Sequence, residues 1–278
     1  MDTHALQQLS ALAHGQRLAV FRMLMRRYPQ SVPAGEIAET LDVPRSTLSP
    51  YLAALCRAAL INQTRAGTSL LYCANMDGAG GLIDYLFCDC ARGRPGISAR
   101  HEAVDGIPLV SPGHDQLRVL FLCTGNSTRS ILAEVLLRDL GQGRFASFSA
   151  GTKPSNTVHP MALTILRDKG HNIDGLSSKE PGAVMRSAGS MDLVLTVCDS
   201  AANEECPILP GFPISCHWGL PDPSKVTSGE AAQRRAFEET YGLLAQKVGQ
   251  LVDLPLETLD RAHLQKHIDE IAGKQFCC

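Results

Sequence analysis

The chain has 278 residues and a mass of 29.9 kDa, with 44% apolar and 19% charged residues and a formal charge of −2. This length suits two folded domains, and this composition excludes a disordered or collagen-like chain. No segment approaches the ~20 consecutive apolar residues of a membrane helix, and the first residues lack the pattern of a secretory signal, so we expect a cytoplasmic protein with no membrane partner.

Residues 1–90 show mostly helical spacing of apolar side chains. Helices are expected near 6–13, 18–25, 34–41, 44–58 and 77–88, with Pro44 as the first residue of the fourth. The segments 60–65 and 70–75, joined by Gly67-Thr68, predict a β-hairpin. Four helices, a hairpin and a last helix, with a helix-turn-helix at 34–58, are typical of a winged-helix domain.

Residues 91–116 contain three Pro and four Gly and have no apolar period, which predicts a linker. Beyond it, strands are expected at 118–123, 145–149 and 191–197, and helices at 130–140, 160–169, 231–252 and 260–272. This alternation predicts a parallel sheet. We therefore predict an α/β protein with a winged helix-turn-helix domain in 1–90, a linker in 91–116 and a parallel α/β domain in 117–278.

Charge and cysteine are also unevenly distributed. Residues 1–100 carry ten Arg and no Lys against seven Asp and Glu, whereas residues 101–278 carry sixteen basic against twenty-one acidic residues. The basic first part is compatible with a nucleic-acid partner. Ten cysteines in a cytoplasmic chain indicate catalysis, redox chemistry or soft-metal binding rather than a disulfide scaffold.

A polar loop, Cys123-Thr-Gly-Asn-Ser-Thr-Arg129-Ser130, follows the first strand of the second domain. Main-chain N–H groups curled at the start of a helix form an oxyanion cradle, and their positive field predicts a lowered pKa for the Cys123 thiol. Arg129 can bind two oxygens of a tetrahedral oxyanion. In this loop, Gly125 would allow close approach of the backbone, and Asn126 can adopt a left-handed turn. The Ser130 hydroxyl can donate a hydrogen bond to the thiolate. The residues expected to bind the oxyanion are Thr124, Gly125, Asn126, Ser127, Thr128 and Ser130.

Residues 118–272 resemble the low-molecular-weight tyrosine phosphatase superfamily, and within it the arsenate reductases that use a thiol/disulfide cascade. The resemblance rests on the segments 123–130, 149–152, 194–207 and 217–223. It implies that Cys123 is the nucleophile and that Asp222 protonates the departing oxygen. The phosphatases normally have a tyrosine just after this Asp-Pro, and Ser224 in its place favours a reductase.

Cys198 and Cys206 follow a strand, on what we expect to be a mobile loop. The resemblance implies a relay in which Cys123 attacks arsenate, Cys198 expels arsenite, and Cys206 resolves the Cys123–Cys198 disulfide. The two relay cysteines are eight positions apart, one more than in the best-known thioredoxin-coupled members. Thioredoxin and glutaredoxin with a small thiol therefore both stay open as the reductant, and no tightly bound cofactor is expected.

The segments 11–21, 37–41 and 46–55 resemble the ArsR family of arsenic- and metal-responsive repressors. The resemblance implies a homodimer that binds two-fold operator DNA. The side chains it places against DNA are Arg45, Ser46, Thr47, Ser49 and Tyr51, with Arg65 at the wing. Pro50 departs from the family inside the recognition helix, where its ring should kink the helix or remove a hydrogen bond.

Cys88 and Cys90 resemble the cysteine pairs in the C-terminal helices of some arsenite-sensing members. Trivalent arsenic is a soft acceptor that binds three ligands, so a third thiol is needed to complete an arsenite site. Cys56, Cys73 or a cysteine of a partner chain could supply it. Cys216 is expected to be structural, while the terminal Cys277-Cys278 could bind metal, serve as an accessory thiol pair or belong to a frayed tail.

These observations favour an arsenate reductase fused to an arsenic-responsive transcriptional regulator. A second hypothesis keeps the regulator and makes residues 117–278 a phosphatase of phosphotyrosine or small phosphate esters. A third treats the whole chain as a regulator whose second domain only binds an oxyanion. The first hypothesis suggests that arsenite made at Cys123 is the ligand of Cys88 and Cys90.

Overall fold

The computed structural model describes residues 3–92, 109–110, 113–204 and 213–273. The chain forms two compact units, one within residues 1–106 and one over residues 107–272. Most of the expected linker lies outside the described residues. No helix in the described part of the chain is both long enough and apolar enough to cross a membrane.

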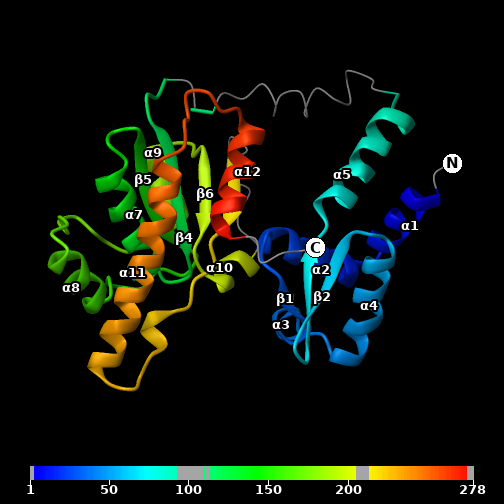
Figure 1. The fold of residues 1–278 in the computed structure, drawn as a ribbon, viewed down its shortest axis with the longest axis horizontal. Coiled ribbons are helices and arrows are strands. Elements are labelled where there is room, and N and C mark those ends of the chain that lie inside the picture. The colour runs from blue at the N-terminus through cyan, green and yellow to red at the C-terminus, as the bar shows by residue number, and fades with distance from the viewer. Residues whose placement is uncertain (1–2, 93–108, 111–112, 205–212, 274–278) are drawn as a thin grey trace. The chain divides into compact units, whose positions relative to one another are not determined.

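The first unit combines helices with a three-stranded antiparallel sheet (Figure 1). Its helices are α1 (Thr3–Leu12), α2 (Gly15–Arg27), α3 (Ala34–Thr40), α4 (Arg45–Arg57) and α5 (Met76–Asp84). Its strands are β1 (Val32–Pro33), β2 (Ile61–Ala66) and β3 (Ser69–Ala74), in the order β1-β3-β2. The predicted hairpin is confirmed, since Ala66 pairs with Ser69 across the Gly67 turn. Strand β1 was not predicted, because two residues carry no readable alternation.

The core of this unit gathers under the helix-turn-helix. Val20 and Leu24 of α2 are fully buried together with Ile37 of α3 and Leu55 of α4. Arg27 is also buried, and its guanidinium donates to Glu36 Oε1 at 2.7 Å, which ties α2 to α3. The packing thus fixes α4 against α2 and leaves its other side to solvent.

Helix α4 starts one residue later than predicted and is not interrupted. Pro44 is the N-cap with an extended backbone (ψ 139°), so Arg45 rather than Pro44 is the first helical residue. Pro50 lies inside the helix, which continues to Arg57. The ring removes one main-chain donor without ending the helix.

Helix α5 continues into a π-helical turn, Tyr85–Cys90. Both segments follow the same direction away from the hairpin (Figure 1). The expected helix at 77–88 therefore exists, but its last part is wound more loosely than an α-helix.

The second unit is a parallel sheet with helices on both faces. Its strands are β4 (Leu117–Cys123), β5 (Phe145–Gly151), β6 (Leu193–Thr196) and β7 (Ile214–His217), in the order β5-β4-β6-β7. All three pairings are parallel, which confirms the predicted fold class. Its helices are α7 (Arg129–Leu140), α8 (Pro160–Asp168), α9 (Pro181–Ala188), α10 (Asp199–Asn203), α11 (Glu230–Val252) and α12 (Arg261–Ala272).

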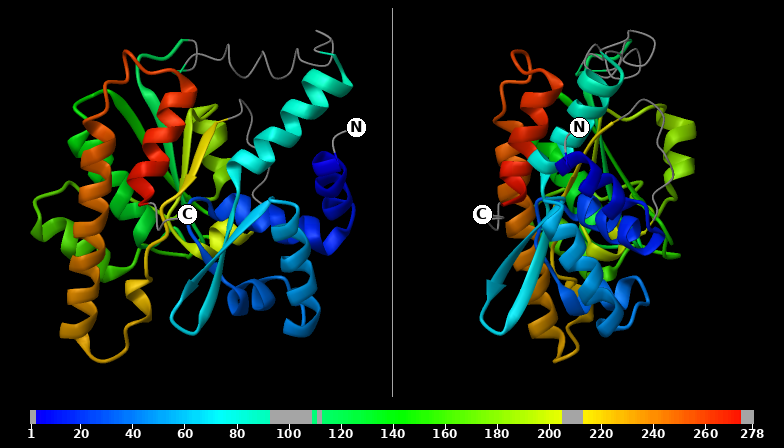
Figure 2. Two further views of the ribbon diagram at one scale, coloured as in Figure 1. Left: turned by 45° about the vertical axis from the view of Figure 1, so that its right-hand side comes forward. Right: turned by 90° about the vertical axis from the view of Figure 1, so that its right-hand side faces the viewer.

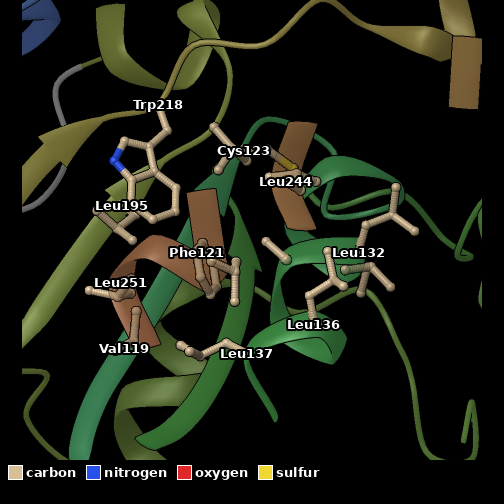
Figure 3. Close-up of a cluster of buried hydrophobic side chains, with 14 of the residues drawn as sticks. Val119, Phe121, Cys123, Leu132, Leu136, Leu137, Leu195, Trp218, Leu244 and Leu251 are labelled. Carbon is tan, nitrogen blue, oxygen red and sulfur yellow. The ribbon is translucent and has the colours of Figure 1, made fainter. Parts of the chain in front are cut away.

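The central strand β4 is buried along its whole length and separates two cores. Val119 and Phe121 point into the larger core, where they meet Leu136 of α7, Trp218 and Leu251 of α11 (Figure 3). Leu120 and Leu122 point to the opposite face, into a smaller core covered by α9. The right-hand view of Figure 2 shows α9 on one side of the sheet and α11 and α12 on the other. This burial holds the carboxyl end of β4, and Cys123 with it, in a rigid frame.

The sequence analysis did not predict α9, α10 or β7. These are short elements of eight, five and four residues, below the length at which apolar spacing is readable. Strand β7 places His217 beside Thr196 at the end of β6, and so completes the sheet edge near Cys123.

Candidate active site and nucleic-acid interface

Cys123 is the last residue of the central strand β4, where it pairs with Gly151 of β5. A Cβ on Gly151 would lie 2.5 Å from Thr124 O and 2.8 Å from Asn126 N, so only glycine fits beneath the loop. The Cys123 carbonyl accepts a hydrogen bond from Thr152 N at 3.0 Å, and that of Thr124 from Lys153 N at 2.9 Å. The ends of two neighbouring strands therefore hold the start of the loop.

The loop turns at Asn126, whose φ of 46° confirms the predicted left-handed conformation. Its buried side chain donates to Ser130 Oγ at 2.9 Å and to Ser149 Oγ at 2.8 Å, and accepts from Lys179 N at 2.7 Å. Close approach at Gly125 is also confirmed, because a Cβ there would lie 2.9 Å from Ser155 Oγ. One asparagine thus joins the loop to β5 and to the segment before α9.

The Cys123 sulfur is buried and held by two hydrogen-bond partners. Asn126 N donates to it at 3.0 Å, and Ser130 Oγ lies 2.9 Å away, as predicted for the serine. Burial nevertheless raises the pKa of the Cys123 thiol above its ordinary value, while the Ser130 hydroxyl and the loop N–H groups oppose the rise. The predicted lowering of this pKa is wrong, because desolvation outweighs the loop dipoles.

A buried polar chain behind the loop was missed by the sequence analysis. Ser149 Oγ donates to Glu134 of α7, and Lys179 Nζ pairs with the same carboxylate at 3.3 Å. Through Asn126 and Ser130, these hydrogen bonds connect the Lys179–Glu134 ion pair to the Cys123 sulfur. The only sequence signal was Glu134 within an otherwise apolar part of the helix.

Arg129, the first residue of α7, points to the loop that carries Asp222. Its Nη2 donates to Asp222 Oδ2 at 2.8 Å and its Nη1 to the Leu220 carbonyl at 2.8 Å. The other oxygen of Asp222 accepts from Ser224 N and Ser224 Oγ, at 3.1 and 2.7 Å. The predicted anion ligand and the predicted acid are therefore neighbours, and the serine that stands in place of tyrosine orients the acid.

Cys198 lies on the other side of the loop, at the start of the segment that we expect to be mobile. It is 2% exposed and forms the N-cap of α10, and its sulfur lies 3.4 Å from Thr124 Oγ1. The negative charge of a Cys198 thiolate also reaches Cys123 and contributes to raising its pKa. Cys206 lies outside the described residues, as do Cys277 and Cys278.

Two histidines flank this arrangement. The buried His217 ring contacts Thr196 Oγ1 at 2.8 Å and Asp199 Oδ1 at 3.1 Å, next to Cys198 in the chain. His159 begins α8, donates its N–H to the Ser127 carbonyl at 2.9 Å, and packs its ring on Phe237. Burial lowers the pKa of His159, and the charge of Asp222 opposes this.

One further loop position and one cysteine complete the site. Thr128 Oγ1 is buried and has no hydrogen-bond partner among the described residues. Cys216 is buried and burial raises its pKa well above the ordinary value, as suits a structural residue.

The side chains expected to contact DNA all lie on the first unit, five of them on α4 and Arg65 on β2. Arg45, Ser46, Thr47 and Ser49 are exposed on α4, whereas Tyr51 is half-buried with its ring 4.9 Å from that of His14. Arg65 is exposed near the end of β2 and donates to the Gly67 carbonyl at 3.2 Å. The tip of the β2–β3 hairpin extends away from the α2 helix (Figure 2).

Cys88 and Cys90 are exposed on the π-helical turn, while Cys56 is half-buried and Cys73 is buried in the same unit. Within the described part of the chain, no three His, Cys, Asp or Glu side chains are close enough together to hold a metal ion. The described residues therefore supply no third ligand beside this pair in its present position.

Comparison with known proteins agrees with this geometry. The model of the low molecular weight phosphotyrosine protein phosphatase family matches residues 118–267, and a helix-turn-helix domain matches residues 12–64. Arsenate reductase 2 of Staphylococcus saprophyticus is 31% identical over 144 residues, which cover 50% of this chain and 98% of that protein. Arsenate reductase of Bacillus licheniformis is 30% identical over 132 residues, 47% of this chain and 91% of that protein. A solved structure of a thioredoxin-dependent arsenate reductase of Corynebacterium glutamicum aligns at 24% identity with a TM-score of 0.36, covering 76% of this chain and 90% of that one.

Proposed function

The chain belongs to the low molecular weight phosphotyrosine protein phosphatase family, and from this premise we propose that it reduces arsenate to arsenite and regulates transcription in response to the product. Its relatives at 30–31% identity are arsenate reductases, and they match over almost their whole length. The helix-turn-helix domain in residues 12–64 supports the regulatory part.

One observation carries the choice of a reductase. A second thiol, that of Cys198, is buried beside the loop. Its sulfur lies 3.4 Å from the side-chain oxygen of Thr124, the residue that follows the nucleophile. A phosphatase needs one cysteine, because hydrolysis moves no electrons. A reductase must supply two electrons, and a neighbouring thiol can do so by forming a disulfide.

The relay follows from the positions of these groups. The Cys123 thiolate attacks arsenic and forms an S–As bond, and Arg129 releases the Leu220 carbonyl and Asp222 to hold two arsenate oxygens. Asp222, released from the arginine and protonated, then gives its proton to the oxygen that leaves as water. Cys198 then attacks the Cys123 sulfur, the S–As bond breaks, and its electron pair leaves with arsenite. Two thiols have been oxidised to one disulfide, and As(V) has been reduced to As(III).

Cys206 resolves this disulfide and produces a Cys198–Cys206 bond that an external dithiol reduces. Thioredoxin and glutaredoxin with a small thiol are both candidates for the reductant. Arsenate reductases that depend on thioredoxin occur among the similar proteins. No tightly bound cofactor is needed for this chemistry.

The first unit binds operator DNA as a homodimer. Arg45, Ser46, Thr47 and Ser49 form an exposed row on α4 that fits a major groove, with Tyr51 at its inner edge and Arg65 on the wing. Exposed apolar side chains on helices at both ends of the unit, among them Leu6, Leu9, Ile83 and Leu86, would be covered by a second copy. An ArsR-type response would use Cys88 and Cys90 to bind arsenite.

Arsenate-dependent oxidation of NADPH tests the enzyme. The purified protein is supplied in parallel with a thioredoxin and a glutaredoxin system, and we expect turnover with one of them. Replacement Cys198→Ser should reduce this turnover by at least roughly a thousandfold, because the electron donor is lost. Cys216→Ser, which changes a buried cysteine away from the loop, is the matched control and should keep the activity.

Hydrolysis of para-nitrophenyl phosphate runs alongside as the test of the phosphatase hypothesis. Ester hydrolysis that survives Cys198→Ser, with no arsenate-dependent oxidation of NADPH by the wild type, would make the second unit a phosphatase.

A further inference from the structure

A buried arginine that has no counter-ion among the described residues lies at the opposite end of β4 from Cys123. Arg118 is 6% exposed, although arginine is almost never buried in proteins unless it is paired. Among the described residues, none forms an ion pair with its guanidinium. Asp192 contacts Arg118 through the main chain instead: its Oδ2 accepts a hydrogen bond from the Arg118 N–H at 2.8 Å.

The contacts that the guanidinium does make leave its charge uncompensated. Nη1 lies 2.6 Å from His114 Nε2, and since arginine can only donate, the ring nitrogen is the acceptor and supplies no negative charge. The guanidinium carbon lies 5.7 Å from the centre of the Phe148 ring, whose face attracts the cation but carries no negative charge. Nε is buried and has no hydrogen-bond partner in the described structure.

A cavity of about 430 Å³ opens beside this side chain. Its lining includes Arg118 and His114 together with the apolar Ala146, Phe148 and Ala188. The end of α9 lies close by, since a Cβ on Gly189 would be 3.6 Å from Arg118 Nη1. Asp115 also lines the cavity but forms no ion pair with the arginine. The cavity is thus lined by one buried positive charge and by apolar side chains.

We propose that this cavity is a second anion site, which binds a small organic molecule through its carboxylate or phosphoryl group. Both groups present two oxygens that match the fork of a guanidinium. The cavity is larger than a bare ion requires, and the Phe148 face and the two alanines would contact the body of the molecule. Arg118 precedes Cys123 by five residues on one strand, about 16 Å away at ~3.3 Å per residue, so the site is separate from the arsenate loop.

Equilibrium dialysis of the full chain with inorganic phosphate, and separately with benzoate, tests this site. We expect two phosphates per wild-type chain, one at the Cys123 loop and one at Arg118. Arg129→Gln should lose the first and keep the second. Arg118→Gln should lose the second, with at least a roughly tenfold weaker affinity, and retain arsenate reduction.

Ala146→Leu fills the cavity without changing any charge, and it decides the result if Arg118→Gln does not fold. Binding of either probe that survives Arg129→Gln and is lost in Ala146→Leu supports the site. The proposal is overturned if neither probe binds outside the Cys123 loop, or if the extra binding survives both Arg118→Gln and Ala146→Leu. Neither outcome depends on whether the chain reduces arsenate.

Discussion

At the scale of single residues, the environment of Cys123 controls the chemistry. The sulfur is buried, and two donors, the Ser130 hydroxyl and Asn126 N–H, offset part of the cost of charging it. Because the pKa of this thiol lies above its ordinary value, the thiolate fraction of the free enzyme rises through the neutral and alkaline range. Activity that needs the thiolate should rise with it.

Replacement Ser130→Ala should shift this rise to higher pH. The hydroxyl lowers the pKa of Cys123, so its removal raises the pKa further and reduces the thiolate fraction at neutral pH. We expect roughly tenfold lower kcat/KM for arsenate near pH 7.5, with recovery at higher pH. The pH profile of kcat/KM measures this directly.

Ser178→Ala is the matched control, because Ser178 Oγ donates to the Asn126 carbonyl on the same loop and does not contact the sulfur. Its profile should coincide with that of the wild type. A Ser130→Ala profile that also coincides with it would show that the hydroxyl does not stabilise the thiolate.

At the scale of elements, α4 shows how a local sequence rule and the fold compete. Pro50 lacks the N–H that would donate to the carbonyl of Ser46, yet the helix runs from Arg45 to Arg57. Leu48, Leu52 and Leu55 bury one face of it against α2, and this packing holds the helix through the missing bond.

Replacement Pro50→Ala should stabilise α4 by up to about 3 kcal/mol, because it restores the hydrogen bond and relieves the ring. This corresponds to roughly a hundredfold greater protection of the amides of residues 45–57 in hydrogen exchange. Ala53→Pro, on the exposed side of the same helix, should lower the protection by a similar factor. Unchanged exchange in Pro50→Ala would mean that the helix already accommodates the ring without cost.

Long elements and the catalytic loop could be predicted from the sequence, and the supporting contacts could not. Segments 118–123 and 231–252 carry clear apolar patterns, and they correspond to β4 and α11. The left-handed turn at Asn126 was readable because asparagine tolerates that conformation.

The burial of Cys198, the ion pair of Lys179 with Glu134, and the Arg118 cavity each join residues far apart in the chain. No local pattern encodes such contacts. The pKa of Cys123 was misjudged for the same reason, since desolvation depends on the whole fold around the loop.

At the scale of the whole molecule, the proposed function places the production of arsenite and the response to it in one polypeptide. If arsenite binds at Cys88 and Cys90, arsenate should act as an inducer only when the second unit can reduce it. The prediction concerns function within one polypeptide and requires no particular arrangement of the two units.

Fluorescence anisotropy with a DNA duplex selected by the protein from random sequence measures this coupling. Arsenate with the active reductant should lower the DNA affinity at least roughly tenfold, and Cys198→Ser should abolish this response while it keeps the response to added arsenite. Cys88→Ser with Cys90→Ser should lose both responses. If arsenite lowers the affinity and arsenate with reductant does not, the two activities are independent.

The most direct test of the account is a single turnover of the fully reduced protein with arsenate and no external reductant. The relay predicts one arsenite per chain, and mass spectrometry should locate a disulfide between Cys198 and Cys206. Cys206→Ser should still release one arsenite and stop at a Cys123–Cys198 disulfide, whereas Cys198→Ser should release none. Arsenite formed in full by Cys198→Ser, or no arsenite from the wild type, would contradict the relay.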